Sequence, residues 1–337
     1  MVKRGLEILN KTNRVGLKEL FSVAKINTDK KLDSWNIGFQ ISPRLNAAGR
    51  MDHANTAYEL LITKDKEEAE VLARDLNNRN IDRQKITEEI VFEIIKDINQ
   101  ESLANGQKIL IAVSPSIYDQ TKEPWNEGII GLVAGRLSEK YYLPALVITG
   151  NDKEIKGSGR SIEEFNVIKA VESLNKNLEK YGGHAAACGF SIAGQDNLNN
   201  FIKEITSLAG EQLSQMNLLP TLSIDAELDF ALLDEQLVEQ IENLAPFGED
   251  NPKPVFLSRE VNIVDIMNMG IDNKHIKLKL KTDNSRIRNA IGFGQAEMWK
   301  DFKIGDKIDI VYYLEINDFN GRREVQLKIV DIKSCNA

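Results

Sequence analysis

The segment KGSGRS, residues 156–161, has the composition of an anion-binding site. Its glycines permit close approach to the backbone, its serine hydroxyls can donate hydrogen bonds, and its arginine offers a planar fork that suits phosphate oxygens. The residues concerned are Gly157, Ser158, Gly159, Arg160 and Ser161. A tight turn with a surface arginine would have the same composition. The segment alone therefore leaves a phosphate site and a structural turn open.

A second segment, GGHAAACGF (182–190), favours the functional interpretation. Gly182 and Gly183 place His184 at a bend, and small residues follow it. Imidazole can hydrogen-bond a phosphate oxygen, or pair with it when protonated. A lone histidine can equally be structural, but this one lies among glycines after an apolar helical segment. We therefore predict that Arg160 and His184 contact a phosphate.

A third segment, PRLNAAGR (43–50), places Arg44, Asn46 and Arg50 around a pair of alanines. It is too small and too polar to be expected as a core segment. Its three hydrogen-bonding side chains could face a substrate. Alternatively, Arg50 caps the end of a helix and Arg44 makes an ordinary ion pair.

Near the C-terminus, HIKLKLK (275–281) alternates cationic and apolar residues, so that its lysines share one face of a strand. Further cations and an aromatic residue follow. The candidates are Lys277, Lys279, Lys281, Arg288, Phe319, Arg322 and Arg323. A cationic sheet face with an aromatic nearby is typical of proteins that bind single-stranded nucleic acid. The alternative is a solvated antiparallel face.

Residue clusters that hold catalytic metals are not found in the sequence. The three histidines, His53, His184 and His275, lie in no HxH, DHH or HExxH context, whereas metal-assisted phosphodiester hydrolysis needs grouped Asp and His ligands. Neither a nucleotide P-loop nor a dinucleotide fingerprint is present. We therefore expect this chain to bind no metal or other cofactor by itself.

Composition places these segments in a globular chain of 337 residues with a net charge of −8. Net charge governs solubility more than it identifies a site, so it does not exclude nucleic acid. No apolar run is long enough to span a membrane, and the N-terminus lacks a signal-peptide pattern. Cys188 and Cys335 lie far apart, without CxxC spacing. We expect a cytoplasmic protein with no membrane partner.

The elements that must position these residues follow from hydrophobic spacing. Short helices are expected in residues 1–65, and a long connecting helix over about 66–102, where isoleucines recur every four residues. Strands then alternate with helices in residues 106–217, which indicates an α/β domain. Residues 108–114 and 144–149 are expected as buried strands, 154–161 as a strand and turn, and 165–180 as a helix.

From residue 218 the pattern changes to short strands with turn signals and one helix, which predicts a small β-barrel such as an OB-fold. The predicted fold is thus a helical segment (1–65), a connecting helix (66–105), an α/β domain (106–217) and a C-terminal barrel (218–337).

In this order, the segments resemble the RecJ family of single-strand-specific 5′→3′ DNA exonucleases. The resemblance rests on PRLNAAGR, WNEGIIGLVAGRL, KGSGRS, YGGHAAACGF, APFGEDNPKP and NGRREVQLKIVDI, and covers nearly the whole chain. It implies a DHH-associated α/β domain and an OB-fold, preceded by the helical tail of a DHH domain. The chain would then lack most of that DHH domain, whose Asp and His motifs hold Mn²⁺ or Mg²⁺ in the family.

The resemblance further implies a role in DNA repair and recombination and a single-stranded DNA substrate. Ser158, Arg160, Ser161 and His184 would grip phosphates near the 5′ end, with Arg160 and His184 stabilising the transition state. Arg44, Asn46 and Arg50 would face the same cleft. Hydrolysis would require a DHH-domain partner, and a separately encoded chain could supply it.

The chain departs from the family pattern at three positions. Asn126-Glu127 stands where a histidine and proline are common, Phe319 where tryptophan is common, and Cys188 where alanine is common. Two other functions remain open: a standalone single-strand-binding or regulatory module, and a short-oligonucleotide phosphoesterase of the same superfamily. The C-terminal barrel argues against the second.

Overall fold

The computed structural model describes residues 1–98, 106–151, 154–283, 286–319 and 322–335. The chain divides into two compact units between Pro220 and Thr221. The first comprises residues 8–220, and the second comprises residues 221–337 together with Met1–Glu7. The sequence placed this boundary three residues earlier.

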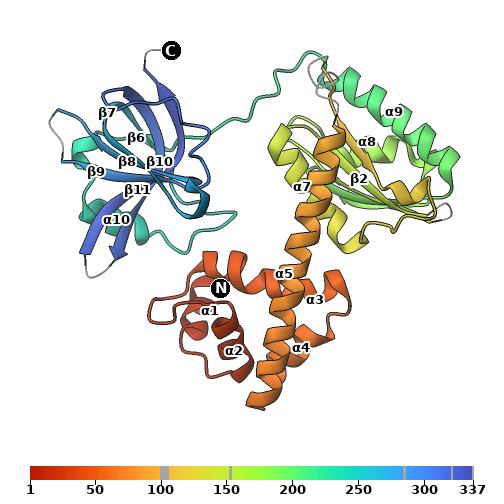
Figure 1. Ribbon diagram of the computed structural model, residues 1–337, viewed down its shortest axis with the longest axis horizontal. Coiled ribbons are helices and arrows are strands. Elements are labelled where there is room, and N and C mark those ends of the chain that lie inside the picture. Colours follow the sequence, from red (N-terminus) through yellow and green to blue (C-terminus); the bar gives the residue numbers. More distant parts are fainter. Residues whose placement is uncertain (99–105, 152–153, 284–285, 320–321, 336–337) are drawn as a thin grey trace. The chain divides into compact units, whose positions relative to one another are not determined.

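Short helices precede a long one, as the spacing of apolar residues predicts (Figure 1). They are α1 (Val2–Leu9), α2 (Val15–Val23), η1 (Asn36–Ile41), α3 (Ser42–Met51), α4 (Asn55–Ile62) and α5 (Lys66–Asp97). Asp65 caps α5, because its carboxylate accepts a 2.9 Å hydrogen bond from the Glu68 amide. The first half of α5 packs against α2, α3 and α4 and its second half against α7 (Glu127–Tyr141). The end of the predicted connecting helix, residues 99–105, lies outside the described residues.

The expectation that PRLNAAGR contributes no core is wrong. These residues lie in α3, where Ala47 and Ala48 are completely buried. Small side chains let α3 pack closely against α5, so this helix buries alanine where a typical helix would bury leucine.

The α/β domain is a five-stranded sheet in the order β1-β2-β3-β5-β4. Its strands are β1 (Leu110–Val113), β2 (Ala145–Gly150), β3 (Ile155–Arg160), β4 (Lys180–His184) and β5 (Ala187–Ile192). β1 and β2 are parallel, and the remaining pairs are antiparallel. One face packs against α7, and the other packs against α8 (Val167–Ser173) and α9 (Gln195–Leu213).

Two local expectations in this domain need correction. KGSGR forms the continuous strand β3 rather than a strand and turn, because alternate residues fit the two packed faces of the sheet. The helix expected over residues 165–180 ends at Ser173, and Lys180 already belongs to β4. With both corrections, KGSGR lies in β3 and GGHAAACGF spans β4 and β5, so the two segments form one side of the same sheet, with β5 in the middle.

The second unit is a closed barrel, and with the α/β domain it confirms the predicted fold class. Its strands are β6 (Ala226–Glu227), β7 (Phe256–Met269), β8 (His275–Lys281), β9 (Arg288–Gly292), β10 (Lys307–Phe319) and β11 (Arg322–Ser334). Pairing of β10 with β7 closes the five long strands around an apolar core. Helix α10 (Glu235–Glu242) packs against β10 and β11.

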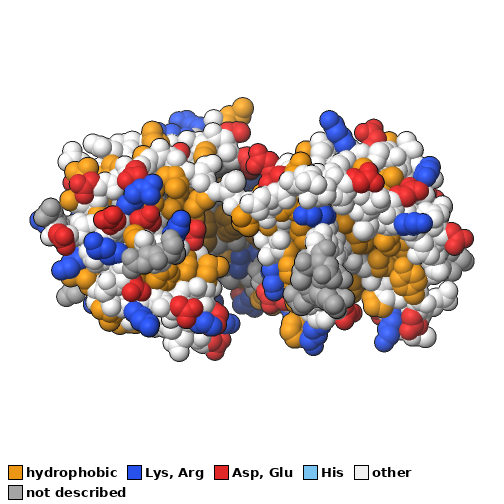
Figure 2. Space-filling view, turned by 90° about the horizontal axis from the view of Figure 1, so that it is seen from above, with side chains coloured by type: hydrophobic (Ala, Val, Ile, Leu, Met, Phe, Trp, Pro, Cys, Tyr) orange, Lys and Arg blue, Asp and Glu red, His pale blue; other side chains and the backbone are white. Residues whose placement is uncertain are grey.

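None of the described helices combines the length and the apolar character needed to cross a membrane. On the face shown in Figure 2, Lys and Arg side chains are interspersed with Asp and Glu. Positive charge is therefore not gathered into one patch on that face, and any anion site there depends on local geometry.

Candidate phosphate-binding site

The polar residues of KGSGRS share one side of strand β3. Gly157 and Gly159 face the core on the α8 and α9 side, where an added Cβ would lie 2.1 Å from the Phe190 ring or 2.7 Å from the Cys188 sulfur. Lys156, Ser158 and Arg160 alternate with them and are half-buried on the other side. Glycine therefore allows close packing at these two positions. Because successive side chains of a strand point to opposite sides, the three polar side chains lie together on the other face.

Strand register extends this face across β5 and β4, because residues directly opposite each other in a sheet point to the same side. Three rows result. The first row is Arg160, Ala187 and His184; the second is Ser158, Gly189 and Gly182; the third is Lys156, Ser191 and Lys180. Each row joins residues of KGSGRS to the segment around GGH. The two motifs thus belong to one surface.

Helix α7 covers β2 and β3 but has few contacts with β5 and β4. An added Cβ at Gly131 of α7 would lie 3.0 Å from the Ser158 hydroxyl and 3.4 Å from the Arg160 guanidinium. An added Cβ at Gly135 would lie 3.9 Å from the Arg160 side chain. These glycines leave room for the two polar side chains beneath the helix. Beyond the helix, the residues of the rows that belong to β5 and β4 form an open floor. Three of them are small: Ala187, Gly189 and Gly182.

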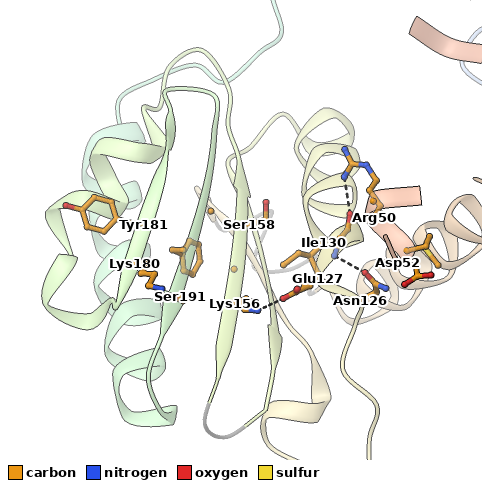
Figure 3. Close-up of a pocket in the computed structure, with 16 residues that line it drawn as sticks. Arg50, Asp52, Asn126, Glu127, Ile130, Lys156, Ser158, Lys180, Tyr181 and Ser191 are labelled. Atoms are coloured by element: carbon orange, nitrogen blue, oxygen red, sulfur yellow. Dashed lines mark hydrogen bonds and ion pairs between the residues drawn. The ribbon is translucent and has the colours of Figure 1, made fainter. Parts of the chain in front are cut away.

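A cavity of about 670 Å³ lies over this floor. Residues of the second and third rows form one side, and the end of α3 and the start of α7 form the other (Figure 3). The lining residues are Gly49, Arg50, Met51, Asp52, Asn126, Glu127, Gly128, Ile130, Lys156, Gly157, Ser158, Lys180, Tyr181, Gly189, Phe190 and Ser191. The volume lies within the range of pockets that bind small ligands.

The wall opposite the floor is fixed by contacts between α3 and α7. The Arg50 guanidinium donates a 3.0 Å hydrogen bond to the Gly128 carbonyl oxygen. A Cβ at Gly128 would lie 2.2 Å from the Arg50 carbonyl oxygen, so only glycine fits there without a shift. The Asn126 side chain caps α7 by accepting a 2.8 Å hydrogen bond from the Gly128 amide.

An ion pair occupies one end of the cavity. The Lys156 ammonium lies 2.6 Å from a Glu127 carboxylate oxygen (Figure 3). It lies 3.1 Å from a carboxylate oxygen of Glu154. Hydrogen bonds to Glu127 and Glu154 raise the pKa of Lys156 above its usual value. Glu127 therefore neutralises a cation that lines the cavity.

The remaining residues of the two motifs lie beside the cavity. Arg160 donates a 2.9 Å hydrogen bond to the Gly159 carbonyl oxygen, and His184 is exposed two strands away, about 10 Å by strand spacing. The Ser161 hydroxyl donates to the Phe165 carbonyl oxygen at 2.6 Å, and its amide donates to Ala186. Ser161 therefore anchors the β4–β5 turn that follows His184.

The three polar residues of PRLNAAGR separate in the structure. Arg50 lines the cavity together with Ser158. Arg44 donates hydrogen bonds to the Asn77 side chain at 3.0 Å and to the Gln40 carbonyl oxygen at 2.6 Å, and burial lowers its pKa. Asn46 is exposed. Neither Arg44 nor Asn46 is among the described residues that line the cavity.

Sequence reasoning missed Lys180, Ser191 and Glu127, which line the same cavity. A signal for Lys180 was present, because residues 180, 182 and 184 share one face once the segment is read as a strand. The helix expected over residues 165–180 concealed it. Ser191 and Glu127 reach the cavity only through strand pairing and helix packing.

The barrel carries the predicted lysine face. Ile276, Leu278 and Leu280 are buried, so Lys277, Lys279 and Lys281 lie on the outer side of β8. Lys279 pairs with Asp265 of β7 at 2.8 Å, and this contact lowers the pKa of Asp265. The lysine face is therefore partly neutralised.

The other barrel candidates are dispersed. Arg288 lies opposite buried Leu280 and donates a 2.8 Å hydrogen bond to the Leu233 carbonyl oxygen, on the other side of the sheet from the lysines. Arg323 pairs with Glu235 at 3.3 Å and Glu239 at 2.9 Å on α10. The side chains of Phe319 and Arg322 lie outside the described part of the structure.

An exposed aromatic residue not predicted from the sequence accompanies the lysine face. Phe293 follows β9 and packs edge-on against His275, with ring centroids 5.5 Å apart. The Lys328 ammonium lies 5.9 Å from the centre of the same ring. Lys277, Ile291 and Lys328 form a row across β8, β9 and β11. Cations and a ring thus meet on one face of the barrel.

No group of three or more His, Cys, Asp or Glu residues that could hold a metal ion occurs among the described residues. The cavity carries only Asp52 and Glu127 as acids. Asp52 pairs with Arg79 at 3.1 Å, and Glu127 pairs with Lys156. The described residues of the cavity therefore do not fit a divalent metal centre.

Comparisons with known proteins agree with these two domains. Residues 106–211 match the family model of the DHHA1 domain, and residues 224–331 match that of the RecJ OB domain. The chain is 32% identical over 330 residues to the single-stranded-DNA-specific exonuclease RecJ of Bacillus subtilis, covering 97% of this chain and 40% of that protein. It is 30% identical to RecJ of Haemophilus influenzae, covering 94% of this chain and 54% of that protein.

The fold is also similar to that of a solved relative. The crystal structure of RecJ from Thermus thermophilus in complex with Mn²⁺ matches with a TM-score of 0.81 and 25% identity, over 100% of this chain and 46% of that one. The chain spans about half the length of the relatives it matches. The chain thus carries a DHHA1 domain and a RecJ OB domain, and it is similar to RecJ proteins over nearly its whole length.

Proposed function

We propose that this chain supplies the phosphate-binding part of a single-stranded-DNA-specific 5′→3′ exonuclease of RecJ type, acting in DNA repair and recombination. The observation that carries the proposal is the row structure of the sheet. Arg160 and His184 flank Ala187 in the first row, and Ser158 lies beside two glycines in the second. Two cationic or hydrogen-bonding groups around a floor of small residues suit a phosphate oxyanion.

In this proposal, the 5′ end of the strand lies on the open floor beyond α7. Arg160 holds phosphate oxygens through its planar fork, and His184 donates from the opposite side of the row. Because both groups contact non-bridging oxygens, they also stabilise the negative charge that develops as the phosphate becomes pentacoordinate. Arg50 approaches the same strand from α3, across the cavity.

The barrel would bind the strand farther from its end. Lys277 and Lys328 would follow the backbone, and exposed Phe293 would stack on a base. Such contacts are tolerant of sequence, in keeping with an enzyme that digests many sequences. Their strength should fall as salt concentration rises, because counterions are released from the strand.

Hydrolysis requires the divalent metal, Mn²⁺ or Mg²⁺, which activates water and neutralises phosphate charge. The Thermus relative binds these ions. We propose that the metal ligands come from a DHH domain, in a separate chain or elsewhere in a longer one. The residues of this chain then bind, orient and stabilise the phosphate.

A standalone single-strand-binding or regulatory module is the second candidate, favoured by the described residues' lack of a metal cluster. The two functions differ in what Arg160 does. In a binding module it contributes affinity alone, whereas in the exonuclease it also affects turnover.

The test is digestion of 5′-phosphorylated single-stranded DNA with Mn²⁺, using this chain, a RecJ DHH-domain fragment, and both together. We expect release of mononucleotides only from the mixture. We also expect Arg160→Ala to lower its turnover at least tenfold, as for other groups that stabilise a developing charge. Rapid digestion by this chain alone, or an inactive mixture whose components associate, would refute the proposal.

A further inference from the structure

We propose that the third row, formed by Lys156, Ser191 and Lys180, binds a further phosphate of the same DNA strand. The proposal rests on the proposed function, since it takes the first phosphate to lie at Arg160 and His184. It assigns a role to Lys180, Ser191 and Glu127, which the sequence analysis did not predict as site residues.

The spacing of the rows supports this assignment. Side chains on one face of a strand recur about every 6.7 Å, similar to the separation of successive phosphates in an extended single strand. The third row therefore lies about 13 Å from the first. A strand whose 5′ phosphate lies at the first row would bring its second phosphate past Ser158 and its third to Lys156 and Lys180.

The residue types of the three rows also fit a DNA strand that lies across them. Glycines in the second row leave the floor free of side chains between two cationic ends. An added Cβ at Gly182 would meet nothing within 4 Å, so the space above it is open. Beyond it, Lys180 and Ser191 line the cavity side by side (Figure 3).

Charge pairing distinguishes the two lysines. Lys156 is held by Glu127 and Glu154, whereas Lys180 is exposed and has no carboxylate partner among the residues that the structure describes. Arg50 on the opposite wall adds another cation, and Asp52 beside it is occupied by Arg79. An incoming phosphate would thus meet Lys180 directly and would compete with Glu127 for Lys156.

The experiment measures binding of three 5′-phosphorylated oligodeoxythymidylates to the full chain by calorimetry: pdT, the dinucleotide pdTpdT and the trinucleotide pdTpdTpdT. These carry one, two and three phosphates. We expect the step from dinucleotide to trinucleotide to tighten binding roughly fivefold, as one well-placed ion pair does. Lys180→Ala should abolish that step and leave pdT binding unchanged, whereas Lys180→Arg should retain it.

Two further variants distinguish a failure of the third-row proposal from a failure of the proposed function. Lys169→Ala removes an exposed lysine from α8, on the other face of the sheet, and should bind all three ligands like the wild type. Arg160→Ala should weaken all three. If Arg160→Ala weakens all three while Lys180→Ala keeps the trinucleotide step, the third row is not a subsite and the proposed function stands. If Arg160→Ala weakens none, the proposed function itself fails.

Discussion

At the scale of single residues, the site is defined by which charges are already paired. Lys156 has two carboxylate partners, Arg44 is bound to neighbouring carbonyl oxygens, and Arg323 is bound to α10. Arg160 contacts only a carbonyl oxygen of its own strand among its described hydrogen bonds. The free energy available for binding a phosphate therefore differs between cations that look equivalent in the sequence.

Glu127→Gln should strengthen binding of 5′-phosphorylated oligonucleotides about two- to fivefold, because it removes a carboxylate that competes with phosphate for Lys156. Fluorescence anisotropy at two salt concentrations measures the effect, which should shrink at high salt. Glu172→Gln makes the same charge change on α8, on the other face of the sheet, and is the control. Equal gains from both substitutions would mean that only net charge matters.

Cys188 yields a prediction for stability against pH. Burial raises the pKa of its thiol from 9.0 to about 11. The thiol ionises at lower pH in the unfolded chain than in the folded one. The contribution of Cys188 to the free energy of unfolding is therefore fully present below pH 9 and is lost as pH rises from 9 towards 11. Cys188→Ala should lose this part of the pH dependence.

Chemical denaturation of both proteins at several pH values measures the difference. The variant should also be less stable at pH 7, since the sulfur packs against Gly159 and its neighbours. Parallel pH profiles for wild type and variant would show that Cys188 does not ionise on unfolding in this range.

At the scale of elements, the site depends on one strand, one helix and one hairpin. Alternation in β3 sends glycines to the core and polar side chains to α7, and the glycines of α7 make space for them. In the β4–β5 hairpin, Gly183 has a φ of 150° and its Cβ would meet the Ala187 carbonyl oxygen at 2.2 Å. Glycine is therefore required there for the hairpin that carries His184.

Two glycine substitutions should separate folding from binding. Gly157→Ala places a methyl group against the Phe190 ring and should destabilise the α/β domain by about 1–3 kcal/mol, as overpacking does. Gly182→Val projects into the open floor, so it should leave thermal stability nearly unchanged and weaken oligonucleotide binding. Thermal unfolding and anisotropy on both variants test this. Unimpaired binding by stable Gly182→Val would place the phosphate elsewhere.

Much of this arrangement could be predicted from the sequence. The spacing of apolar residues located most helices and strands, and KGSGRS and GGHAAACGF marked the strands β3, β4 and β5 of the candidate site. Strand register could not be predicted, because it depends on pairing between residues about thirty positions apart, such as Ser158 with Gly189. For the same reason Ser191 was missed, whereas Lys180 was missed because residues 165–180 were expected to be helical. The helical role of PRLNAAGR was missed because its buried residues are alanines.

At the scale of the whole molecule, the proposed function assigns different chemistry to each of the two units. The α/β unit carries the rows proposed to bind phosphates, and the barrel carries lysines with the exposed ring of Phe293. On the lysine face, Asp265 neutralises Lys279, so the barrel should bind single strands moderately and without sequence preference. Phosphate recognition at the 5′ end would then come from the α/β unit.

Amide hydrogen exchange, followed by mass spectrometry, tests most directly whether phosphates bind to the sheet face. The full chain is compared with and without a 5′-phosphorylated single strand of about 20 nucleotides, and with the same strand lacking the 5′ phosphate. If phosphates bind to this face, amide exchange should be slower over β4 and the β4–β5 turn, residues 180–187, with the phosphorylated strand. Protection there should be smaller with the strand that lacks the 5′ phosphate. Protection confined to residues 256–334, the same for both strands, would contradict phosphate binding at this face.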